Sequence, residues 1–396
     1  MGVPSCQYDH ARHRDEQGRK PDRSQASPRL CHGRQRSRVP NRLILVLTLV
    51  CALVAGTVEG FADSLRVATY NTELSRDGPG LLLRDIVRGE DTQVDAVLQV
   101  IAEVSPDILV LQGFDYDLKN TALTAFNDAL TGYGTPYPHL FSARPNTGLQ
   151  TGLDMDGNGR TAEPRDAQGY GRFSGQGGMA ILSRHPILTE EVRDFSSLLW
   201  RDLPDALLPV TTEGSPFPSV EAQEIQRLST TAHWVVPIQP EGAEPLYLLT
   251  FHASPPVFDG PEDRNGKRNH DEIIFWKHFM DGHFGASPTA RFVVIGDANN
   301  DPTGGEGLKP AILGLLNDPR LQDPAQRSAG SAAISGDPFD TVDWDDPVPG
   351  NLRVDYVLPS ADWRVTGAGV HWPDGEAGEI AGTASRHRLV WVDLAD

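Results

Sequence analysis

Cysteine is absent from most of this chain. The three cysteines, Cys6, Cys31 and Cys51, all lie within the first 51 of its 396 residues. The remainder therefore has no disulfide and no thiol for catalysis or metal binding. An exported protein permits this lack but does not require it, so the cysteine count excludes thiol chemistry without fixing the compartment.

Positive charge is also scarce. The whole chain has 35 Lys and Arg against 54 Asp and Glu, a formal net charge of −19, and from Asp63 onward the balance is 25 against 49. Proteins that bind duplex DNA without sequence preference use many cation–phosphate contacts and usually show a basic face. The composition therefore disfavours a long nucleic-acid footprint. It still permits a nuclease that holds one phosphate with a few arginines or a metal ion.

Long apolar runs are lacking except at residues 43–58, an uncharged segment shorter than the roughly 20 residues of a membrane span. Arg42 precedes this segment, and Gly60-Phe-Ala62 has the small-x-small pattern of a cleavage site. We predict a signal peptide at 43–62 and a secreted or periplasmic protein. A retained membrane anchor is the alternative.

The first 42 residues carry ten Lys or Arg against four acidic residues and show no hydrophobic pattern. We interpret residues 1–42 as a disordered basic leader or an untranslated extension. After cleavage, residues 63–396 are expected to form a single domain without a membrane span, and a monomer.

A buried strand that ends in polar residues organises the rest of the chain. The apolar run within Arg291–Pro302 is bounded by Gly and Pro, and it leads into a loop that carries Asp297, Asn299 and Asp301. A carboxylate two residues from an amide at a strand end suits a site in the crevice beyond the strand tips. The alternative interpretation is an Asx-rich turn.

Gly296-Asp-Ala-Asn299 resembles the Gly-Asp-x-Asn signature of the endonuclease/exonuclease/phosphatase superfamily, which has the DNase I-like fold. Other landmarks of that family follow in the expected order. The resemblance implies an α/β protein, a four-layer α/β/β/α sandwich of two packed mixed β-sheets flanked by helices. The landmarks are Thr69–Asn71, Pro106–Gln112, Met179–Arg184, Thr250–His252, Arg353–Val357 and Ser385–His387.

Hydrophobic periodicity places further elements. Apolar residues at helical spacing from Val94 to Val104, with Asp91 or Thr92 before them, predict a capped helix. Residues 251–269 are read as a loop, followed by a helix whose apolar face begins at Ile273. Strands are expected at 65–71, 108–112, 178–183, 232–239 and 246–252, a short helix at 311–316, and loops at 143–178 and 328–350.

The resemblance also implies catalytic roles. Asp297 would take or orient the proton of the attacking water, and Asn299 would fix Asp297 and the phosphate. His387 would donate to a phosphoryl oxygen while Asp355 holds its ring, and His252 would be a second donor. The alternatives are structural histidines and an Asp355 that caps a turn.

The metal site implied by the resemblance is altered. Asn71 and Glu73 look like the amide-x-carboxylate ligands of the family, and their oxygens suit Mg²⁺ or Mn²⁺. The family places a metal-binding Glu where this chain has Gly113. Asp115 or Asp117 is the candidate substitute, and a solvated acidic loop is the alternative. The family also has Asp where this chain has Arg386. We therefore expect weak metal binding, with Arg386 contacting the phosphate instead.

Two other segments offer candidate sites. Arg264, Arg268 and Asn269 are candidates for phosphate binding, with a salt-bridged surface loop as the alternative. Residues 154–159 match the first half of a calcium loop, in which Asp154, Asp156 and Asn158 are the candidate Ca²⁺ ligands. The twelfth position of that loop is Arg165 rather than Glu, so an Asx-rich turn is the alternative.

Together these features predict an exported, metal-assisted phosphoester hydrolase that acts by in-line attack of water, as a phosphodiesterase, phosphatase or nuclease. The substrate would be a small molecule or nucleic acid. A catalytically weakened or inactive binding protein on the same scaffold is the alternative, because of Gly113 and Arg386. The hydrolase prediction requires that Asn71, His252, Asp297 and His387 meet at one solvent-open rim of the two sheets.

Overall fold

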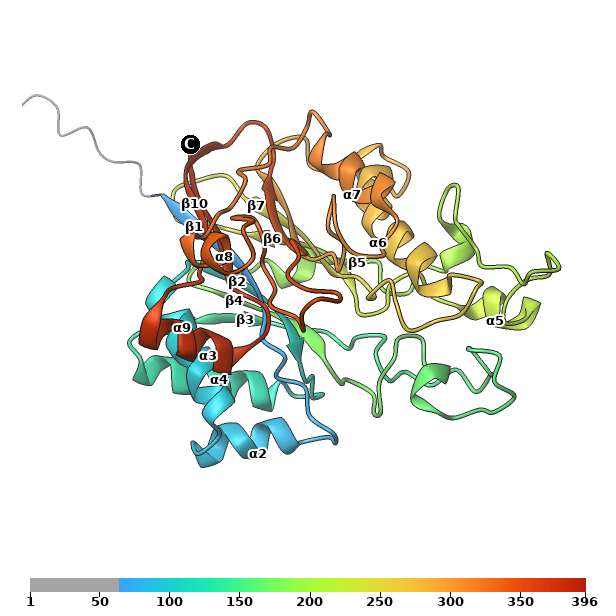
Figure 1. Ribbon diagram of the computed structural model, residues 1–396. Coiled ribbons are helices and arrows are strands. Elements are labelled where there is room, and N and C mark those ends of the chain that lie inside the picture. Colours follow the sequence, from blue (N-terminus) through green and yellow to red (C-terminus); the bar gives the residue numbers. More distant parts are fainter. Residues whose placement is uncertain (1–63) are drawn as a thin grey trace, which may run out of the picture. The chain divides into compact units, whose positions relative to one another are not determined.

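The computed structural model describes residues 64–396, so the predicted leader and signal peptide at 1–62 lie outside the described residues. Two mixed β-sheets pack face to face, and helices cover their outer faces, as the sequence predicted (Figure 1). No helix among residues 64–396 combines the length and the apolar character that a membrane span requires.

The first sheet has the strand order β10-β11-β1-β2-β4-β3. Its strands β1 and β2 are parallel, whereas the remaining pairs are antiparallel. Four helices, α2, α3, α4 and α9, cover its outer face. The bounds are β1 Leu65–Asn71, α2 Leu81–Arg88, α3 Thr92–Val104, β2 Ile108–Phe114, α4 Thr121–Gly132, β3 His139–Phe141, β4 Gly178–Ser183, β10 Arg364–Val370, α9 Gly375–Ala384 and β11 Val390–Ala395.

The second sheet has the strand order β5-β6-β7-β8-β9, with β7 and β8 parallel. Helices α6 and α7 pack on its outer face, on the side opposite the four helices of the first sheet (Figure 1). The bounds are β5 Arg193–Asp194, α5 Val220–Ile225, β6 His233–Ile238, β7 Leu246–His252, α6 Arg264–Met280, β8 Phe292–Asp297, α7 Lys309–Leu316, α8 Ala329–Ile334 and β9 Asp355–Pro359.

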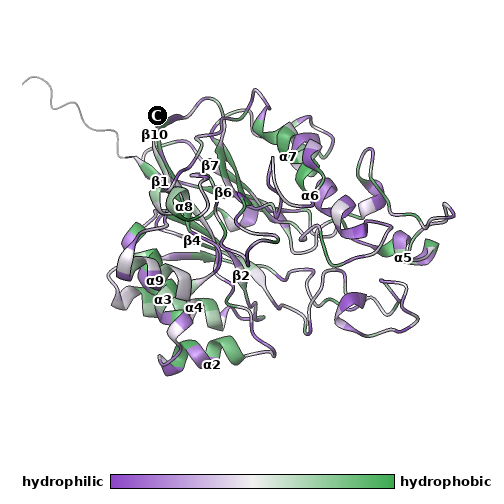
Figure 2. Cartoon of the chain, viewed as in Figure 1, coloured by the Kyte–Doolittle hydropathy of each residue, from purple (hydrophilic) through white to green (hydrophobic). Residues whose placement is uncertain are grey.

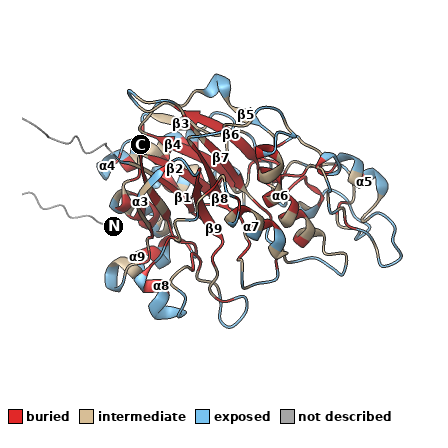
Figure 3. Cartoon of the chain, turned by 90° about the horizontal axis from the view of Figure 1, so that it is seen from above, coloured by how far each residue is buried: buried red, intermediate tan, exposed pale blue. Residues whose placement is uncertain are grey.

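Three hydrophobic clusters hold these layers together. The central cluster lies between the sheets and includes Val67, Ile108, Trp234 and Val293, all fully buried. The helices turn apolar faces to the sheets and polar faces to solvent (Figure 2), and the central strands are buried along their length (Figure 3). Burial of apolar area at about 25 cal/mol per Å² is the main stabilising contribution of such a core.

Several predicted elements are confirmed. The helix at 94–104 is α3, and its N-cap Asp91 accepts a hydrogen bond from the Val94 amide. Three short 3-10 turns, at Pro164–Asp166, Thr189–Glu191 and Trp200–Asp202, lie in the connecting segments.

Two predicted loops were partly wrong. Helix α6 begins at Arg264, so the last part of the loop predicted at 251–269 is helical. The loop predicted at 328–350 contains the short helix α8. Both segments are rich in Gly, Asn or Ser, which have low helix propensity and therefore hide a helix from a sequence pattern.

Candidate active site

The candidate catalytic residues sit at the ends of neighbouring strands. In the second sheet, His252 ends β7, Asp297 ends β8 and Asp355 begins β9, and the strand register pairs His252 with Asp297 and Asp297 with Asp355. In the first sheet, Asn71 ends β1. The side chains of His252, Asp297 and Asp355 therefore lie in a row at one edge of the second sheet. The Asn71 side chain of the first sheet contacts this row, because the end of β1 lies at the same edge of the sandwich.

Asp297 is the centre of this group. Its Oδ2 accepts hydrogen bonds from Nδ2 of Asn71 at 2.9 Å and from Nδ2 of Asn299 at 3.3 Å. The same oxygen lies 3.4 Å from Nε2 of His252 and 4.0 Å from Nε2 of His387. Its Oδ1 accepts from the Asn299 amide at 2.8 Å. Burial favours the neutral acid, but the nearby imidazoles and the Asn71 amide outweigh it and lower the pKa of Asp297.

His387 is held by a carboxylate on its other side. Its Nδ1 donates to Oδ2 of Asp355 at 2.9 Å, and that oxygen also accepts the hydroxyl of Thr341 at 2.9 Å. Burial opposes a charged ring, but the negative charges of Asp355 and Asp297 raise the pKa of His387 to about 9. His387 is therefore an imidazolium at neutral pH, and it can donate from Nε2.

The structure brings Asn71, His252, Asp297, Asn299, Asp355 and His387 together, but one part of the spatial expectation is wrong. Asp297 is 0% exposed and does not lie on an open rim. Side chains cover it, and among them His252 is 17% exposed and lines a pocket. A ligand therefore reaches Asp297 only if the His252 side chain moves or transmits the contact.

Glu73 does not present a free carboxylate to a metal ion. Its Oε1 accepts from Nε of Arg386 at 2.9 Å and from Nη2 of the same guanidinium, and its Oε2 accepts from the Arg386 amide at 2.9 Å. The hydroxyl of Ser385 donates to Oε2 at 3.2 Å. Burial opposes ionisation, but the Arg386 hydrogen bond and the charge of His387 lower the pKa of Glu73.

Gly113 leaves no space for the carboxylate that the family places there. Its φ is +67°, and a Cβ at this position would lie 2.5 Å from Oδ1 of Asn71 and 3.0 Å from the Glu73 amide nitrogen. The backbones of the β1 and β2 ends approach closely only because residue 113 has no side chain.

Asp115 does not take over the missing role in this arrangement. Its two carboxylate oxygens accept the backbone N–H groups of Arg76 and Gly177, each at 2.9 Å. Burial raises its pKa to about 6 even though these hydrogen bonds oppose the shift. Asp115 therefore ties two loops to the end of β2.

Within residues 64–396, two groups place three ligand atoms within 4.8 Å of one another. The first is Asp297, Asp355 and His387, in which a metal would have to displace the shared proton on His387. The position the resemblance implies, at Asn71 and Glu73, does not fit a divalent cation. Its one carboxylate is already neutralised by a guanidinium, and the second cannot be accommodated at residue 113.

The second group is Asp154, Asp156 and Asp166, in the predicted calcium loop. The carboxylates of Asp154 and Asp166 accept hydrogen bonds from backbone amides of the same loop. Asp154 accepts from the amides of Gly157 and Gly159, both at 2.7 Å, and Asp166 accepts from the Met155 amide at 2.9 Å. Oδ1 of Asn158 accepts from the Arg160 amide at 2.8 Å. These contacts describe an Asx-rich turn, and Ca²⁺ binding stays a prediction.

The three candidate phosphate-binding residues on α6 fall into two groups. Arg268 is buried and donates to the carbonyls of four residues, and Asn269 donates to the carbonyls of Ser254 and Ala298. Both side chains therefore hold loops in place, and Arg268 also lines the same pocket as His252. Arg264 donates to Oε1 of Gln226 at 3.0 Å and lines the pocket. The carbonyl partners of Arg268 are those of Gln168, Arg227, Leu228 and Ser229.

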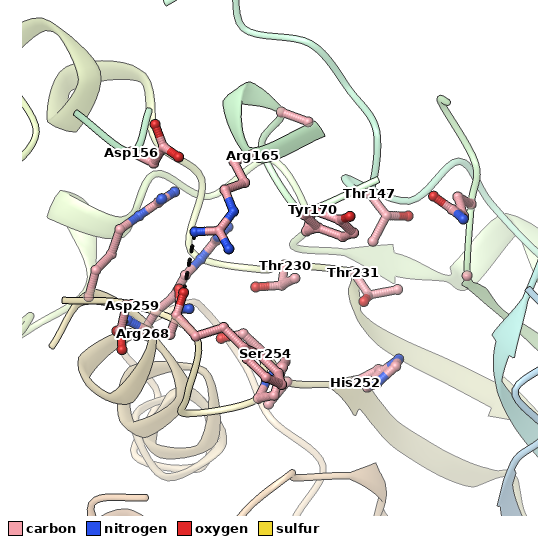
Figure 4. Close-up of a pocket in the computed structure, with 18 of the residues that line it drawn as sticks. Thr147, Asp156, Arg165, Tyr170, Thr230, Thr231, His252, Ser254, Asp259 and Arg268 are labelled. Carbon is pink, nitrogen blue, oxygen red and sulfur yellow. Dashed lines mark hydrogen bonds between the residues drawn. The ribbon is translucent and has the colours of Figure 1, made fainter. Parts of the chain in front are cut away.

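A cavity of about 800 Å³ is lined by His252 at the end of β7 (Figure 4). Its walls come from the segment before β4 and from the loop between β7 and α6. Arginine side chains and aromatic rings share these walls, and Tyr170 and Phe258 are 58% and 75% exposed. The lining includes Arg165, Tyr170, Phe217, Ser254, Phe258 and Arg264.

Sequence patterns missed three residues that shape the centre. Thr341 holds Asp355, Ser385 joins Glu73 to the backbone of Asn71 at 2.8 Å, and the ring of Trp344 meets His387 edge-on with 5.7 Å between centroids. Ser385 lies in a motif that the sequence did single out. Thr341 and Trp344 lie in a Gly/Pro/Asp-rich loop that gives no periodic signal.

Comparisons with known proteins identify the family and agree with the fold. Residues 68–387 match the sequence profile described as "Endonuclease/Exonuclease/phosphatase family". A solved endonuclease/exonuclease/phosphatase from Beutenbergia cavernae DSM 12333 is similar, with a TM-score of 0.51, 18% identity, and coverage of 84% of this chain and 72% of that one. Sphingomyelinase C from Streptomyces griseocarneus gives a TM-score of 0.45 at 17% identity, covering 84% and 99% of the two chains. The search of curated proteins gave no match.

Proposed function

Since the chain belongs to the endonuclease/exonuclease/phosphatase family, we propose that it is a phosphoester hydrolase that acts by in-line attack of water. The observation that carries the proposal is the contact of one carboxylate, Asp297, with the side chains of Asn71, Asn299, His252 and His387. A bare scaffold has no evident need for two imidazoles and their carboxylate partners around one buried oxygen.

The proposed reaction uses these groups in separate roles. Because Asp297 is fully buried, the proposed reaction requires the side chains that cover it to move. The water oxygen then forms a bond to phosphorus, and its proton passes to Asp297. The bond from phosphorus to the leaving oxygen breaks, that oxygen takes a proton from solvent, and Asp297 later returns its proton to solvent. The high pKa of His387, about 9, suits a group that donates to a phosphoryl oxygen throughout. His252 is the partner that lines the pocket, so the phosphoryl group would enter at its side.

The proposed substrate is a small phosphodiester or phosphomonoester whose leaving group occupies the 800 Å³ cavity. The formal net charge of −19 argues against a long nucleic-acid footprint, though it does not exclude a nuclease. Any Mg²⁺ or Mn²⁺ would be held weakly, because Glu73 is already paired with Arg386. Export remains part of this proposal and rests on the apolar run at 43–58.

The test is a panel of chromogenic phosphomonoesters and phosphodiesters plus plasmid DNA, assayed with Mg²⁺, Mn²⁺, Ca²⁺ or a chelator. We expect turnover by the wild-type protein, and a loss of at least about 100-fold in Asp297→Ala and in His252→Ala. Asp374→Asn, at an exposed position, is the control. Activity that survives Asp297→Ala would come from a contaminant or another site.

A non-catalytic binding protein is the second candidate, and the complete burial of Asp297 favours it. Titration calorimetry with inorganic phosphate separates the two candidates. Binding without turnover on any substrate would support the binding protein. Turnover that depends on Asp297 would exclude it.

A further inference from the structure

We propose that Arg386 takes the place of the divalent cation in this chain, so that phosphoester hydrolysis proceeds without a metal ion. The inference rests on the proposed hydrolase function and concerns the groups that hold the phosphoryl oxygens. Glu73 then acts as a positioning residue that fixes a guanidinium, rather than as a metal ligand.

The first step of the argument is the engagement of Glu73. Four donors from Ser385 and Arg386 converge on its two oxygens, and one of them is the Arg386 backbone amide. A side chain can rotate away from an arriving ion, but the amide is fixed by the chain between α9 and β11. A divalent ion at Glu73 would therefore displace an ion pair and remain close to a guanidinium that repels it.

The second step is that neither position 113 nor Asp115 supplies a second free carboxylate beside Glu73 to offset this repulsion. Gly113 adopts φ +67°, and even a Cβ there would meet Asn71 Oδ1 at 2.5 Å. Asp115 has both oxygens bound to backbone amides. Asn71 donates through Nδ2 to Asp297, and its Oδ1 accepts the Glu73 amide at 3.2 Å. The backbone conformation at residue 113 therefore excludes the carboxylate that the family places there.

The third step is what Arg386 can offer a phosphate. Its side chain is 63% exposed although Glu73 anchors it through Nε and Nη2. Among residues 64–396, no acceptor takes a hydrogen bond from its Nη1. An anchored guanidinium with a free edge can donate to nonbridging phosphoryl oxygens, which is the charge compensation that a metal gives in related chemistry. No proton leaves the guanidinium, so the bond changes are those of the proposed reaction.

His387 follows Arg386 directly and lies 4.0 Å from the Asp297 carboxylate. Arg386 is therefore the sequence neighbour of a residue that lies beside the Asp297 carboxylate. The Glu73 side chain that anchors it leaves the chain two residues after Asn71, which also contacts Asp297. Both ends of the ion pair are thus tied to the centre through short stretches of backbone.

The experiment combines an activity measurement with a metal-binding measurement that does not need turnover. Wild-type protein is freed of metal with a chelator and assayed on the best substrate of the panel, and Mn²⁺ binding is measured by calorimetry and by electron paramagnetic resonance. We expect less than a twofold change in rate with chelator, and no Mn²⁺ bound at micromolar concentrations.

Three variants complete the test. Arg386→Ala should lose about 100-fold in rate, and added guanidinium ion should restore part of it, which a folding defect would not allow. Arg386→Asp should gain measurable Mn²⁺ affinity and become sensitive to chelator. Arg364→Ala, an exposed arginine on β10, is the control and should behave as wild type.

The possible failures are distinguishable. If chelator abolishes wild-type turnover and one equivalent of Mn²⁺ binds and restores it, the inference is overturned while the hydrolase function stands. The same holds if Arg386→Ala keeps its full rate in chelator. Absence of turnover under every condition would overturn the hydrolase function itself.

Discussion

The amide of Asn71 donates to the carboxylate of Asp297 at 2.9 Å, and this hydrogen bond joins the end of β1 in the first sheet to the end of β8 in the second. The two residues are 226 positions apart. Oδ1 of Asn71 also accepts a hydrogen bond from the Glu73 amide. Asn71 therefore connects Asp297 to Glu73, which forms the ion pair with Arg386. One side chain thus couples the packing of the two sheets to the geometry of the candidate active site.

The first prediction concerns this contact. Asn71→Asp replaces the donor by a second carboxylate beside the buried Asp297, and like charges in a buried site destabilise the folded state. We expect a loss of about 2–4 kcal/mol in the free energy of unfolding at pH 7, measured by urea denaturation. The loss should shrink toward pH 4, where one carboxylate is protonated.

The second prediction concerns Gly113. Because its Cβ would meet Asn71 and Glu73, Gly113→Ala should cost clearly more than the roughly 1 kcal/mol expected from left-handed backbone strain alone. Gly134→Ala is the matched control, since Gly134 has φ +79° and no heavy atom within 4 Å of the added Cβ. Thermal and urea unfolding measure both. Equal losses would show that the close approach at residue 113 relaxes at no cost.

Gly113→Glu extends the same argument to the metal. It restores the residue type of the family, but we expect no gain in Mn²⁺ affinity, because the side chain must first displace the end of β1. Calorimetry with Mn²⁺ decides the point. Strong metal binding by this variant would contradict our interpretation of the backbone.

Much of the fold was predictable because apolar periodicity survives in the central elements. Strand β8 is a continuous apolar run, as expected for a strand buried on both faces, and helix α3 has apolar residues at helical spacing. Asp91 caps α3, as its position in the sequence suggested. The register of His252, Asp297 and Asp355 across three strands was not predictable from periodicity. It depends on long-range strand pairing, for which only the resemblance to a family gave a guide.

The candidate site shows where sequence reasoning stops. The ion pair of Glu73 and Arg386 links residues 313 positions apart, and no local pattern encodes it. Arg268 was expected to face a phosphate because the guanidinium fork matches phosphate oxygens, but its donors satisfy four backbone carbonyls instead. The full burial of Asp297 likewise follows from the side chains that converge on it, not from its own neighbours in sequence.

The third prediction concerns pH. The pKa of His387 is about 9 in the folded protein against an ordinary 6.5, because the charges of Asp355 and Asp297 outweigh burial. A group whose pKa is raised on folding stabilises the folded state fully below pH 6.5, and this contribution is lost as pH rises through about 9. We therefore expect the free energy of unfolding to fall between pH 6.5 and pH 9. In His387→Gln this fall should be much smaller, as urea denaturation at pH 6, 7.5 and 9 would show.

The titration of His387 can also be followed directly by NMR of the ring. A ring that titrates near pH 6.5, or a pH dependence that His387→Gln leaves intact, would contradict the prediction. Either result would mean that Asp355 is not an effective counter-charge for the imidazolium.

The fourth prediction separates two arginines one helical turn apart on α6. Arg268 satisfies four carbonyls in the interior, so Arg268→Gln leaves acceptors buried without donors and should lower the free energy of unfolding by about 2–4 kcal/mol. Both arginines line the pocket, but Arg264 donates only to the Gln226 side chain, so Arg264→Gln should change stability by less than about 1 kcal/mol and raise KM instead. Urea denaturation and steady-state kinetics on the same preparations measure both effects. The reverse pattern, with stability lost in Arg264→Gln and unchanged in Arg268→Gln, would show that the carbonyl contacts of Arg268 contribute little to stability.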